Sequence, residues 1–446
     1  MDHTSLIVHN CILVTVDQED HIFEDGMLVI EGDTIQYAGP KVEPLPPGKQ
    51  LNMRGKIVLP GLINTHTHSP ASLFRGFGDD LFLMDWLHNY MWPVERHMTA
   101  EDAYHGSRLS YLEYLRHGMT TNVDMWYFSE SVALAAQSIG LRSLVAAGVF
   151  SWPTPESSDS LHCASEFIEK YYDKSNETLV YPCYGPHDAY SCSQELLREI
   201  AHLSETYNTL IVHAHLSETV ENNEEILEKY GVTPTRYFEQ TGVFERRFLG
   251  AHCIWLTDED MSIFHEHDAS VSYNPVSNLK LCDGILPARR LLDAGVRITL
   301  GIDGAQSNNS LDLLADQKTG VLIQKMKEKD PTFFPARQAV RMVTIDAADS
   351  IGMGHAIGSI EVGKKADIIS LDTNDLNLTP LQDNMRDMVY SHITYSATGA
   401  NVSDVFVNGR QLMQDKVILG INVEEIRQEA QKASDRLHRI RQSNGG

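Results

Sequence analysis

Long apolar runs, an excess of basic residues and closely paired cysteines are all missing from this sequence. Its 446 residues contain 36 Lys and Arg against 61 Asp and Glu, a formal net charge of −25, which argues against nucleic acid as a partner. Apolar residues never run together for the roughly 18 positions that a membrane-spanning helix needs, so we expect no membrane partner. The six cysteines form no Cys-x-x-Cys pair, and residues 1–10 contain no basic leader. We therefore expect a cytoplasmic protein with reduced thiols and no signal peptide.

The pattern of strands and helices changes twice along the chain. Short strands separated by turn residues fill residues 5–60, and the same pattern returns near residue 358. Between them, apolar strand-like runs alternate with helical stretches about eight times, as in a closed barrel of βα units. Beyond the run that ends at residue 68, the expected barrel strands are 120–125, 143–150, 179–184, 210–216, 248–252, 269–273 and 297–302. We therefore predict an α/β fold with a small β-sandwich domain from 1–60 and 358–421, a catalytic (β/α)8 barrel over 61–357, and a C-terminal helix within 422–446.

Two of the expected strands end in a His-x-His pair. His66 and His68 end the first barrel strand, and His213 and His215 end a later one. Side chains two positions apart on a strand point to the same face, so each pair can face one spot in the barrel mouth. One such pair is weak evidence, because a chain with 20 histidines also produces this spacing by chance.

Two further strand ends strengthen the pattern. His252 ends the strand 248–252, Asp303 follows the strand near 297–302, and Glu218 lies three positions beyond His215. Enzymes built on this barrel place their chemistry at the C-terminal ends of the strands, so these side chains share one rim. Three imidazoles and a carboxylate, with a position left for water, suit zinc, and iron fits the same ligands.

Several longer motifs resemble the amidohydrolase superfamily over nearly the full chain. The segments that carry this resemblance are 60–68, 215–218, 251–253, 301–304 and 357–367. Within that superfamily, the segments 85–87, 92–95, 184–187, 277–281 and 307–312 look like those of the 5-methylthioadenosine/S-adenosylhomocysteine deaminases. The resemblance implies a metallo-dependent hydrolase barrel with a β-sandwich.

The resemblance also implies roles for individual residues. One divalent metal per subunit, Zn²⁺ with Fe²⁺ or Mn²⁺ as alternatives, would be held by His66, His68, His215 and Asp303. Asp303 would also take part in catalysis, with Glu218 as proton shuttle and His252 as the group that orients the attacking water. Trp86, Glu95 and His187 would contact substrate, Glu95 through a ribose. His213 is expected to be a buried structural histidine, and the protein is expected to form a homo-oligomer.

The implied activity is hydrolytic deamination of an adenine nucleoside, of the 5′-methylthioadenosine, S-adenosylhomocysteine or adenosine type, to its inosine analogue and ammonia. One alternative is an aminohydrolase or chlorohydrolase of another amino-substituted ring, such as guanine or an s-triazine, and a ribose contact at Glu95 argues against it. The other is a catalytically inactive binding scaffold, which the complete set of ligands and shuttle disfavours. A one-metal site is favoured because the fourth expected strand, 179–187, contains no lysine to bridge two metals.

One departure from the resembling deaminases concerns the far end of the substrate. Family members with two arginines in the loops after the third strand use them near this end. Here 147–148 and 152–156 contain none. We therefore expect only modest discrimination between nucleosides that differ in their 5′ group.

Overall fold

The computed structural model describes residues 5–382 and 386–443 and divides the chain into two compact units. One unit contains residues 1–64, 114–121 and 312–421, and the other contains 65–113, 122–311 and 422–446. The domain boundaries that we expect from the sequence stay a prediction. Among the described residues, none of the helices is both long and apolar enough to cross a membrane.

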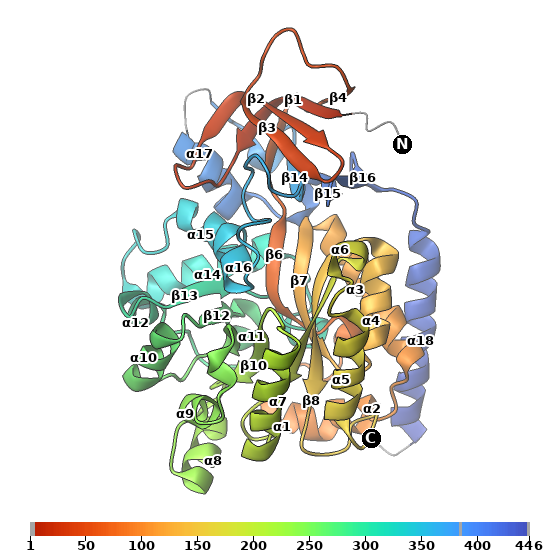
Figure 1. Cartoon of the computed structure of the whole chain (residues 1–446), viewed down its shortest axis with the longest axis vertical. Helices are drawn as coiled ribbons and strands as arrows, with labels where there is room; N and C mark the ends of the chain where they lie inside the picture. The colour runs from red at the N-terminus through yellow and green to blue at the C-terminus, as the bar shows by residue number, and fades with distance from the viewer. Residues whose placement is uncertain (1–4, 383–385, 444–446) are drawn as a thin grey trace. The chain divides into compact units, whose positions relative to one another are not determined.

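Eight parallel strands form a nearly closed barrel in which spatial order follows chain order (Figure 1). They are β6 (Leu62–Thr67), β7 (Met119–Trp126), β8 (Arg142–Val149), β9 (Val180–Pro186), β10 (Val212–Leu216), β11 (Phe248–His252), β12 (Ser270–Tyr273) and β13 (Arg297–Leu300). A parallel bridge between Thr67 and Asp303 brings the end of the first strand beside the segment that follows the last. The predicted barrel is confirmed.

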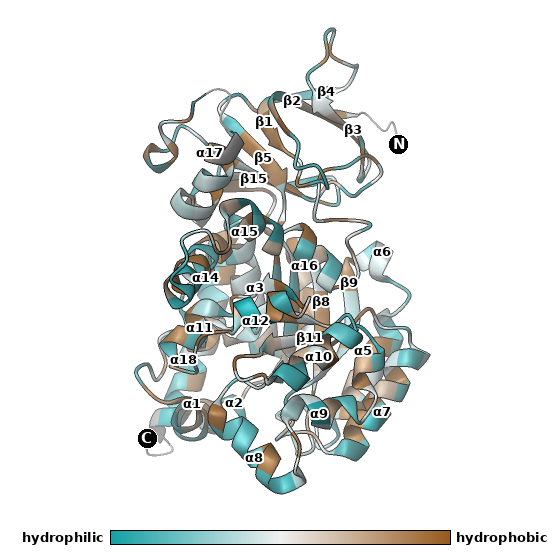
Figure 2. Cartoon of the chain, turned by 90° about the vertical axis from the view of Figure 1, so that its left-hand side faces the viewer, coloured by the Kyte–Doolittle hydropathy of each residue, from teal (hydrophilic) through white to brown (hydrophobic). Residues whose placement is uncertain are grey.

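Helices connect and cover these strands. The unit with most of the barrel contains all or most of α1 (Leu83–Trp86), α2 (Trp92–Glu95), α3 (Ala100–Arg116), α4 (Ser129–Ile139), α5 (Ser160–Tyr171), α6 (Ser175–Thr178), α7 (Gln194–Thr206), α8 (Val220–Tyr230), α9 (Pro234–Glu239), α10 (Asp258–Glu266), α11 (Pro275–Lys280), α12 (Ala288–Asp293) and α13 (Ala305–Asn308). The other unit contains α14 (Leu313–Glu328), α15 (Ala336–Met342) and α16 (Ile345–Ser350). α17 (Arg386–Ser391) and α18 (Val423–Ser443) follow. Figure 2 shows α5 and α7 with both teal and brown residues, as expected of helices with one buried face.

Burial explains the composition of the barrel strands. Every residue of β7 and β8 is buried, as in a parallel sheet covered on both faces. Polar residues inside the barrel are satisfied by one another: the Thr65 hydroxyl lies 2.7 Å from that of Ser272 and 2.9 Å from that of Thr299. This layer joins β6, β12 and β13 near the strand ends that carry the site.

Strands from both ends of the chain form a nine-stranded mixed sheet. It contains β1 (Leu6–Val14), β2 (Ile22–Glu31), β3 (Thr34–Pro40), β4 (Lys49–Asn52), β5 (Lys56–Pro60), β14 (Ile368–Asp372), β15 (Val402–Val407), β16 (Arg410–Gln414) and β17 (Val417–Ile418). The two ends meet where β5 pairs antiparallel with β14, with Leu59 opposite Ile369. The predicted small β domain from both chain ends is confirmed.

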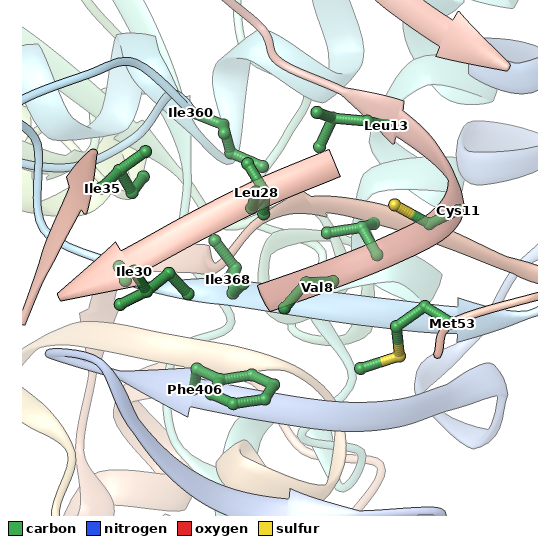
Figure 3. Packing of buried hydrophobic residues seen from close by; sticks show 12 residues of the cluster. Val8, Cys11, Leu13, Leu28, Ile30, Ile35, Met53, Ile360, Ile368 and Phe406 are labelled. Carbon is green, nitrogen blue, oxygen red and sulfur yellow. The ribbon is translucent and has the colours of Figure 1, made fainter. Parts of the chain in front are cut away.

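One hydrophobic cluster holds this sheet together (Figure 3). It includes Leu28 of β2, Ile35 of β3, Ile368 of β14 and Phe406 of β15, all at most 2% exposed. Because β3 and β15 lie far apart in the strand order, shared packing between them requires the sheet to curl around its core.

The strands that the sequence predicts in these regions are 6–16, 26–30, 34–38, 56–59, 367–371, 401–407 and 416–419, and two strands of the sheet are missing from them. β4 is a four-residue strand with mostly exposed side chains, so it carries no apolar signal. β16 follows β15 through the two-residue turn Asn408-Gly409, in which both residues have positive φ. An Asn-Gly pair between strands is a strong hairpin signal and could have located β16.

Candidate active site

The strand ends of the barrel bring together the predicted ligands. His66 and His68 come from β6, His215 from β10, and Asp303 from the turn after β13. Nε2 of His68 lies 3.1 Å from Nε2 of His215 and 3.4 Å from Oδ1 of Asp303. Nε2 of His66 lies 3.5 Å from the same carboxylate oxygen. Three imidazole nitrogens and one oxygen therefore converge on one point.

Hydrogen bonds at the far side of each ring assign the proton on two of these histidines. Nδ1 of His68 lies 2.7 Å from the Met125 carbonyl, and Nδ1 of His215 lies 2.8 Å from the His187 carbonyl. A carbonyl oxygen only accepts, so both Nδ1 atoms carry the proton and donate. Nε2 of each ring is left as a lone pair that faces the shared point.

His66 reaches the same state through a second histidine. Nδ1 of His213 lies 2.8 Å from the Leu249 carbonyl and donates to it, which leaves Nε2 of His213 as an acceptor. This Nε2 atom lies 2.8 Å from Nδ1 of His66, which therefore carries the proton. His213 is buried, as expected, and it also orients His66.

The resulting arrangement fits a divalent cation. Two nitrogen lone pairs that face each other at 3.1 Å repel unless a positive charge lies between them. Ligand atoms held about 2.0–2.1 Å from a tetrahedral zinc ion lie about 3.3 Å apart. The separations of 3.1–3.5 Å found here match that spacing. Donor type and distance are both those of a metal centre, and His66, His68 and Asp303 form one of the described clusters suited to an ion.

His252 differs from the three histidines above, although it too lies close enough to His66 and His215 to share an ion. The side-chain amide of Asn278 lies 2.9 Å from Nδ1 of His252 and donates to it. An Nδ1 atom that accepts leaves the proton on Nε2. His252 therefore presents an N–H donor rather than a lone pair, which suits contact with an oxygen atom.

Asp303 is held by donors on both carboxylate oxygens. The hydroxyls of Ser277 and Ser307 donate to Oδ2 at 2.6 and 2.9 Å, and the Gly304 N–H donates to Oδ1 at 2.8 Å. Burial raises the pKa of Asp303, but the contact with His66 and the nearby histidines outweigh it and hold the pKa well below its usual range. Asp303 is a carboxylate at neutral pH.

Backbone conformation helps to aim the side chains at the strand ends. Ser217, His252 and Asp303 have φ values of 50°, 69° and 59°. This left-handed region is unfavourable for residues other than glycine and is found where the surrounding structure enforces it, often at functional sites. The chain turns sharply after β10, β11 and β13, and Thr219 then caps α8 by accepting from the Asn222 N–H.

Glu218 lies between Ser217 and this cap, buried beside His252. One of its oxygens lies 3.5 Å from Nδ1 of His252, and its carboxyl is hydrogen-bonded to that of Asp283. Burial, followed by the charges of Asp283 and Asp303, raises the pKa of Glu218 well above its usual value. The raised pKa favours the protonated form of Glu218, which is able to donate.

A pocket of about 460 Å³ opens over these residues, within the volume range of small-molecule sites. Trp86, Glu95 and His187, the expected substrate contacts, all line it. Trp86 donates its indole N–H to the Phe77 carbonyl at 3.0 Å, so it can meet a ligand only through its ring. His187 stacks on Phe150, with ring centroids 4.6 Å apart.

His187 is neutral. Burial lowers its pKa to about 3. The same cause lowers the pKa of His213 to about 3 and that of His252 to about 4. All three are uncharged imidazoles at pH 7.

Glu95 faces the pocket from α2. Burial raises its pKa to about 7, and an interaction with the Tyr127 hydroxyl partly opposes this rise. Glu95 is therefore divided between acid and carboxylate near neutral pH, unlike an exposed glutamate.

The pocket wall after β8 is apolar. It consists of Gly148, Phe150, Trp152, Pro153 and Pro155, together with Thr154. Arg96, directly after Glu95, also lines the pocket, and its Nε–H donates to the Pro93 carbonyl at 3.1 Å. The arginine-free segments 147–148 and 152–156 contribute to this wall, whereas Arg96 directly follows α2.

Sequence reasoning missed Asn278, Asp283, Tyr127 and Arg96. Asn278 lies within the motif segment 277–281, and that position was a signal. Asp283 and Tyr127 meet their glutamate partners only through tertiary contacts, so the spacing of the sequence carries no trace of them.

Comparisons with known proteins agree with this geometry. Residues 57–412 match the amidohydrolase family. The chain is 37% identical over 98% of its length to a 5-methylthioadenosine/S-adenosylhomocysteine deaminase of Caldanaerobacter subterraneus, 99% of which is covered. It is 36% identical over 97% of its length to a 5′-deoxyadenosine deaminase of Methanosarcina barkeri, 98% of which is covered.

A solved structure extends the likeness. An adenosine deaminase from Xanthomonas campestris with bound zinc superposes with a TM-score of 0.92 at 29% identity, over 97% of this chain and 98% of that one. The family match spans most of the barrel and reaches β16. Together with the strand-end histidines and Asp303, it establishes that this chain belongs to the amidohydrolase family.

Proposed function

We propose that this enzyme removes the amino group of an adenine nucleoside by hydrolysis, releasing ammonia and the inosine analogue. The observation that carries the proposal is that the acid Glu218 and the carboxylate Asp303 line one nucleoside-sized pocket together with two histidines of the cation-binding point. Relatives named as deaminases of 5-methylthioadenosine, S-adenosylhomocysteine and 5′-deoxyadenosine support the same chemistry.

The amidohydrolase family is metal-dependent. In this chain His66, His68, His215 and Asp303 would hold one divalent ion, and the zinc-bound relative favours Zn²⁺ over Fe²⁺ or Mn²⁺. When bound, such an ion lowers the pKa of water to about 7 and makes hydroxide available at neutral pH. β9, the fourth barrel strand, contains no lysine that could bridge this ion to a second one.

The protein groups account for every proton in the reaction. Glu218 donates its proton to the ring nitrogen, which makes the carbon that bears the amine electrophilic. Asp303 takes one proton from the attacking water and passes it to the amine. The remaining proton on the new hydroxyl returns to Glu218 as ammonia leaves. The Nε2–H group of His252 donates to the oxygen that becomes the carbonyl.

The pocket supplies binding groups for the rest of the nucleoside. The Trp86 ring and the neutral His187 contact the base, and the Glu95 carboxylate accepts from the ribose hydroxyls. Assembly into a homo-oligomer and a cytoplasmic location stay predictions.

The test is ammonia release from a panel of adenosine, 5′-methylthioadenosine, S-adenosylhomocysteine, guanine and melamine. We expect turnover of the nucleosides, its loss on chelation, and its recovery with one equivalent of zinc per chain. Turnover of guanine or melamine without turnover of any nucleoside would contradict the proposed substrate class. Full activity of the metal-free protein, or two metals per active chain, would contradict the proposed centre.

A further inference from the structure

A buried carboxyl group that has no part in the scheme above lies beside Glu218. Asp283 is 6% exposed and lies in the loop between α11 and α12. The Trp255 indole N–H donates to the main-chain carbonyl of Asp283 at 2.7 Å. Gly284 has a φ of 133°, and a Cβ atom there would come within 2.7 Å of Ile254, so only glycine lets the loop approach this closely. The loop is therefore built to hold Asp283 at the site.

The carboxyl of Asp283 has two partners. The Asn278 amide donates to Oδ2 of Asp283 at 3.2 Å and to Nδ1 of His252 at 2.9 Å. The other partner is the Glu218 carboxyl. Asn278 thus anchors Asp283 and His252 through the two hydrogens of one amide group, and both of its partners adjoin Glu218.

A hydrogen bond between two carboxyl groups needs one proton. Burial first, then the charges of Asp283, Asp303 and Asp188, raise the pKa of Glu218 well above its usual value. Burial also raises the pKa of Asp283, to about 7, but the hydrogen bond with Glu218 acts in the opposite direction. The carboxyl of Asp283 already accepts from the Asn278 amide at Oδ2, as a carboxylate does. We therefore place the proton on Glu218, with Asp283 as the acceptor that fixes the direction of the Glu218 O–H group.

We propose that Asp283 is a positioning residue for the deamination proposed above, on which this inference rests: its carboxylate, anchored by Asn278, holds the Glu218 proton in place. When Glu218 gives its proton to the ring nitrogen, two carboxylates are left side by side. Their repulsion makes the new Glu218 carboxylate a stronger base, so it readily recovers the hydroxyl proton that completes the cycle. Asp283 would thus support both halves of the shuttle without touching substrate.

The first measurement compares the parent with Asp283→Ala and Asp283→Asn. We expect kcat to fall about 10- to 100-fold in both, the range for a misplaced catalytic group. KM should stay within about twofold and the metal content unchanged, because neither a ligand nor a pocket residue is altered. Asp283→Asn keeps the shape of the side chain, so it serves as the probe if Asp283→Ala does not fold. Asp293→Asn, an exposed change at the end of α12, is the matched control and should keep parental kcat.

The second measurement separates positioning from structural support. In a Glu218→Gln background the proton to be positioned is already gone, so adding Asp283→Asn should lower kcat by less than about threefold. An equal loss in both backgrounds, or parental kcat in both single variants at position 283, would overturn the inference. A parent that releases no ammonia from any nucleoside would instead overturn the proposed function and the inference with it.

Discussion

Four histidines of the site share a strand-end position, yet the location of the ring proton divides them into two kinds. His66, His68 and His215 each have a donor bond from Nδ1, whereas Nδ1 of His252 accepts from Asn278. The spacing of the histidines in the sequence contains no information on this difference. It is set by the carbonyl, imidazole or amide group that lies behind each ring.

Glu218 gives the most direct test of the proton scheme. Glu218→Gln should keep one metal per chain and lose roughly two to four orders of magnitude in kcat, because an amide cannot donate the proton that the ring requires. Metal analysis checks that the ion is retained, and steady-state kinetics measure the loss of kcat. Glu224→Gln, an exposed change on the following helix, is the control. A kcat within about threefold of the parent would remove Glu218 from the mechanism.

Glu95 should make nucleoside binding pH-dependent. In the proposed function its carboxylate accepts from the ribose hydroxyls, and burial raises the pKa of Glu95 to about 7. As the pH falls from 8 to 6 the carboxylate takes up a proton, so kcat/KM for adenosine should drop about tenfold relative to Glu95→Gln, which does not titrate. At each pH, kcat/KM of the parent is divided by kcat/KM of Glu95→Gln, so the titration of other groups cancels. A constant ratio would show that Glu95 does not bind the ribose as a carboxylate.

Arg96 decides whether an amino-acid tail is recognised. The apolar wall after β8 favours an uncharged 5′ group, and we expect kcat/KM for 5′-methylthioadenosine to be at least that for S-adenosylhomocysteine. If Arg96 contacts the tail carboxylate, Arg96→Met should lower kcat/KM about tenfold for S-adenosylhomocysteine alone. An equal loss of kcat/KM for both substrates would show that Arg96 acts on the nucleoside part that they share.

At the scale of elements, β10 supports the site with two of its five residues. His215 faces the point on which the proposed ligands converge, and His213, two positions earlier on the same face, orients His66 on a different strand. His213→Phe should keep the barrel folded but weaken metal retention about 10- to 100-fold, because His66 loses the acceptor that fixes its proton. Competition with a chelator measures the loss, and the exposed His202→Gln is the control. Unchanged metal retention would show that His213 only fills space in the core and does not orient His66.

The alternation of strands and helices was enough to predict the barrel, because buried parallel strands are apolar throughout. Period-two spacing and the shared rim placed the strand-end histidines and Asp303 together. The choice of His66, His68, His215 and Asp303 as ligands came from the resemblance to the amidohydrolases. The rest of the site depends on loops whose approach no local pattern encodes. Asp283 reaches Glu218 only because Gly284 and Trp255 set the path of a loop some 65 residues further along the chain.

At the scale of the whole molecule, buried groups of opposite kinds shape the pH dependence of stability. His187, His213 and His252 have folded pKa values of about 3, 3 and 4, so below their unfolded value of about 6.5 the unfolded state binds more protons and stability falls as pH falls. Each of these histidines changes the free energy of unfolding by about 1.4 kcal/mol per pH unit.

Buried carboxyls act with the opposite sign. Burial raises the pKa of Glu95 and Asp283 to about 7 and that of Asp188 to about 8, so their stabilising effect is lost as pH rises from about 4 to these values. The two sets should nearly cancel between pH 4.5 and 6.5. From pH 6.5 to 8 the carboxyls release their protons while the unfolded histidines lose the last of theirs, and the free energy of unfolding should fall by about 2 kcal/mol.

Thermal unfolding of the metal-free protein across this range tests the balance. The midpoint should be nearly flat from pH 4.5 to 6.5 and lower at pH 8. Asp188→Asn should remove most of the decline above pH 6.5, because Asp188 has the highest of the three carboxyl pKa values. A midpoint that rises from pH 6.5 to 8 would contradict the assignment.

The pairing of β5 with β14 has a consequence for synthesis on the ribosome. These strands lie about 300 residues apart in the chain, and elongation at about 5–20 residues per second separates their emergence by roughly 15–60 s. During that interval the edge of β5 that β14 later covers is open to pairing with other chains. The first strands to be made are therefore among the last to be completed, and a nascent chain that stalls before residue 368 presents a strand edge prone to aggregation.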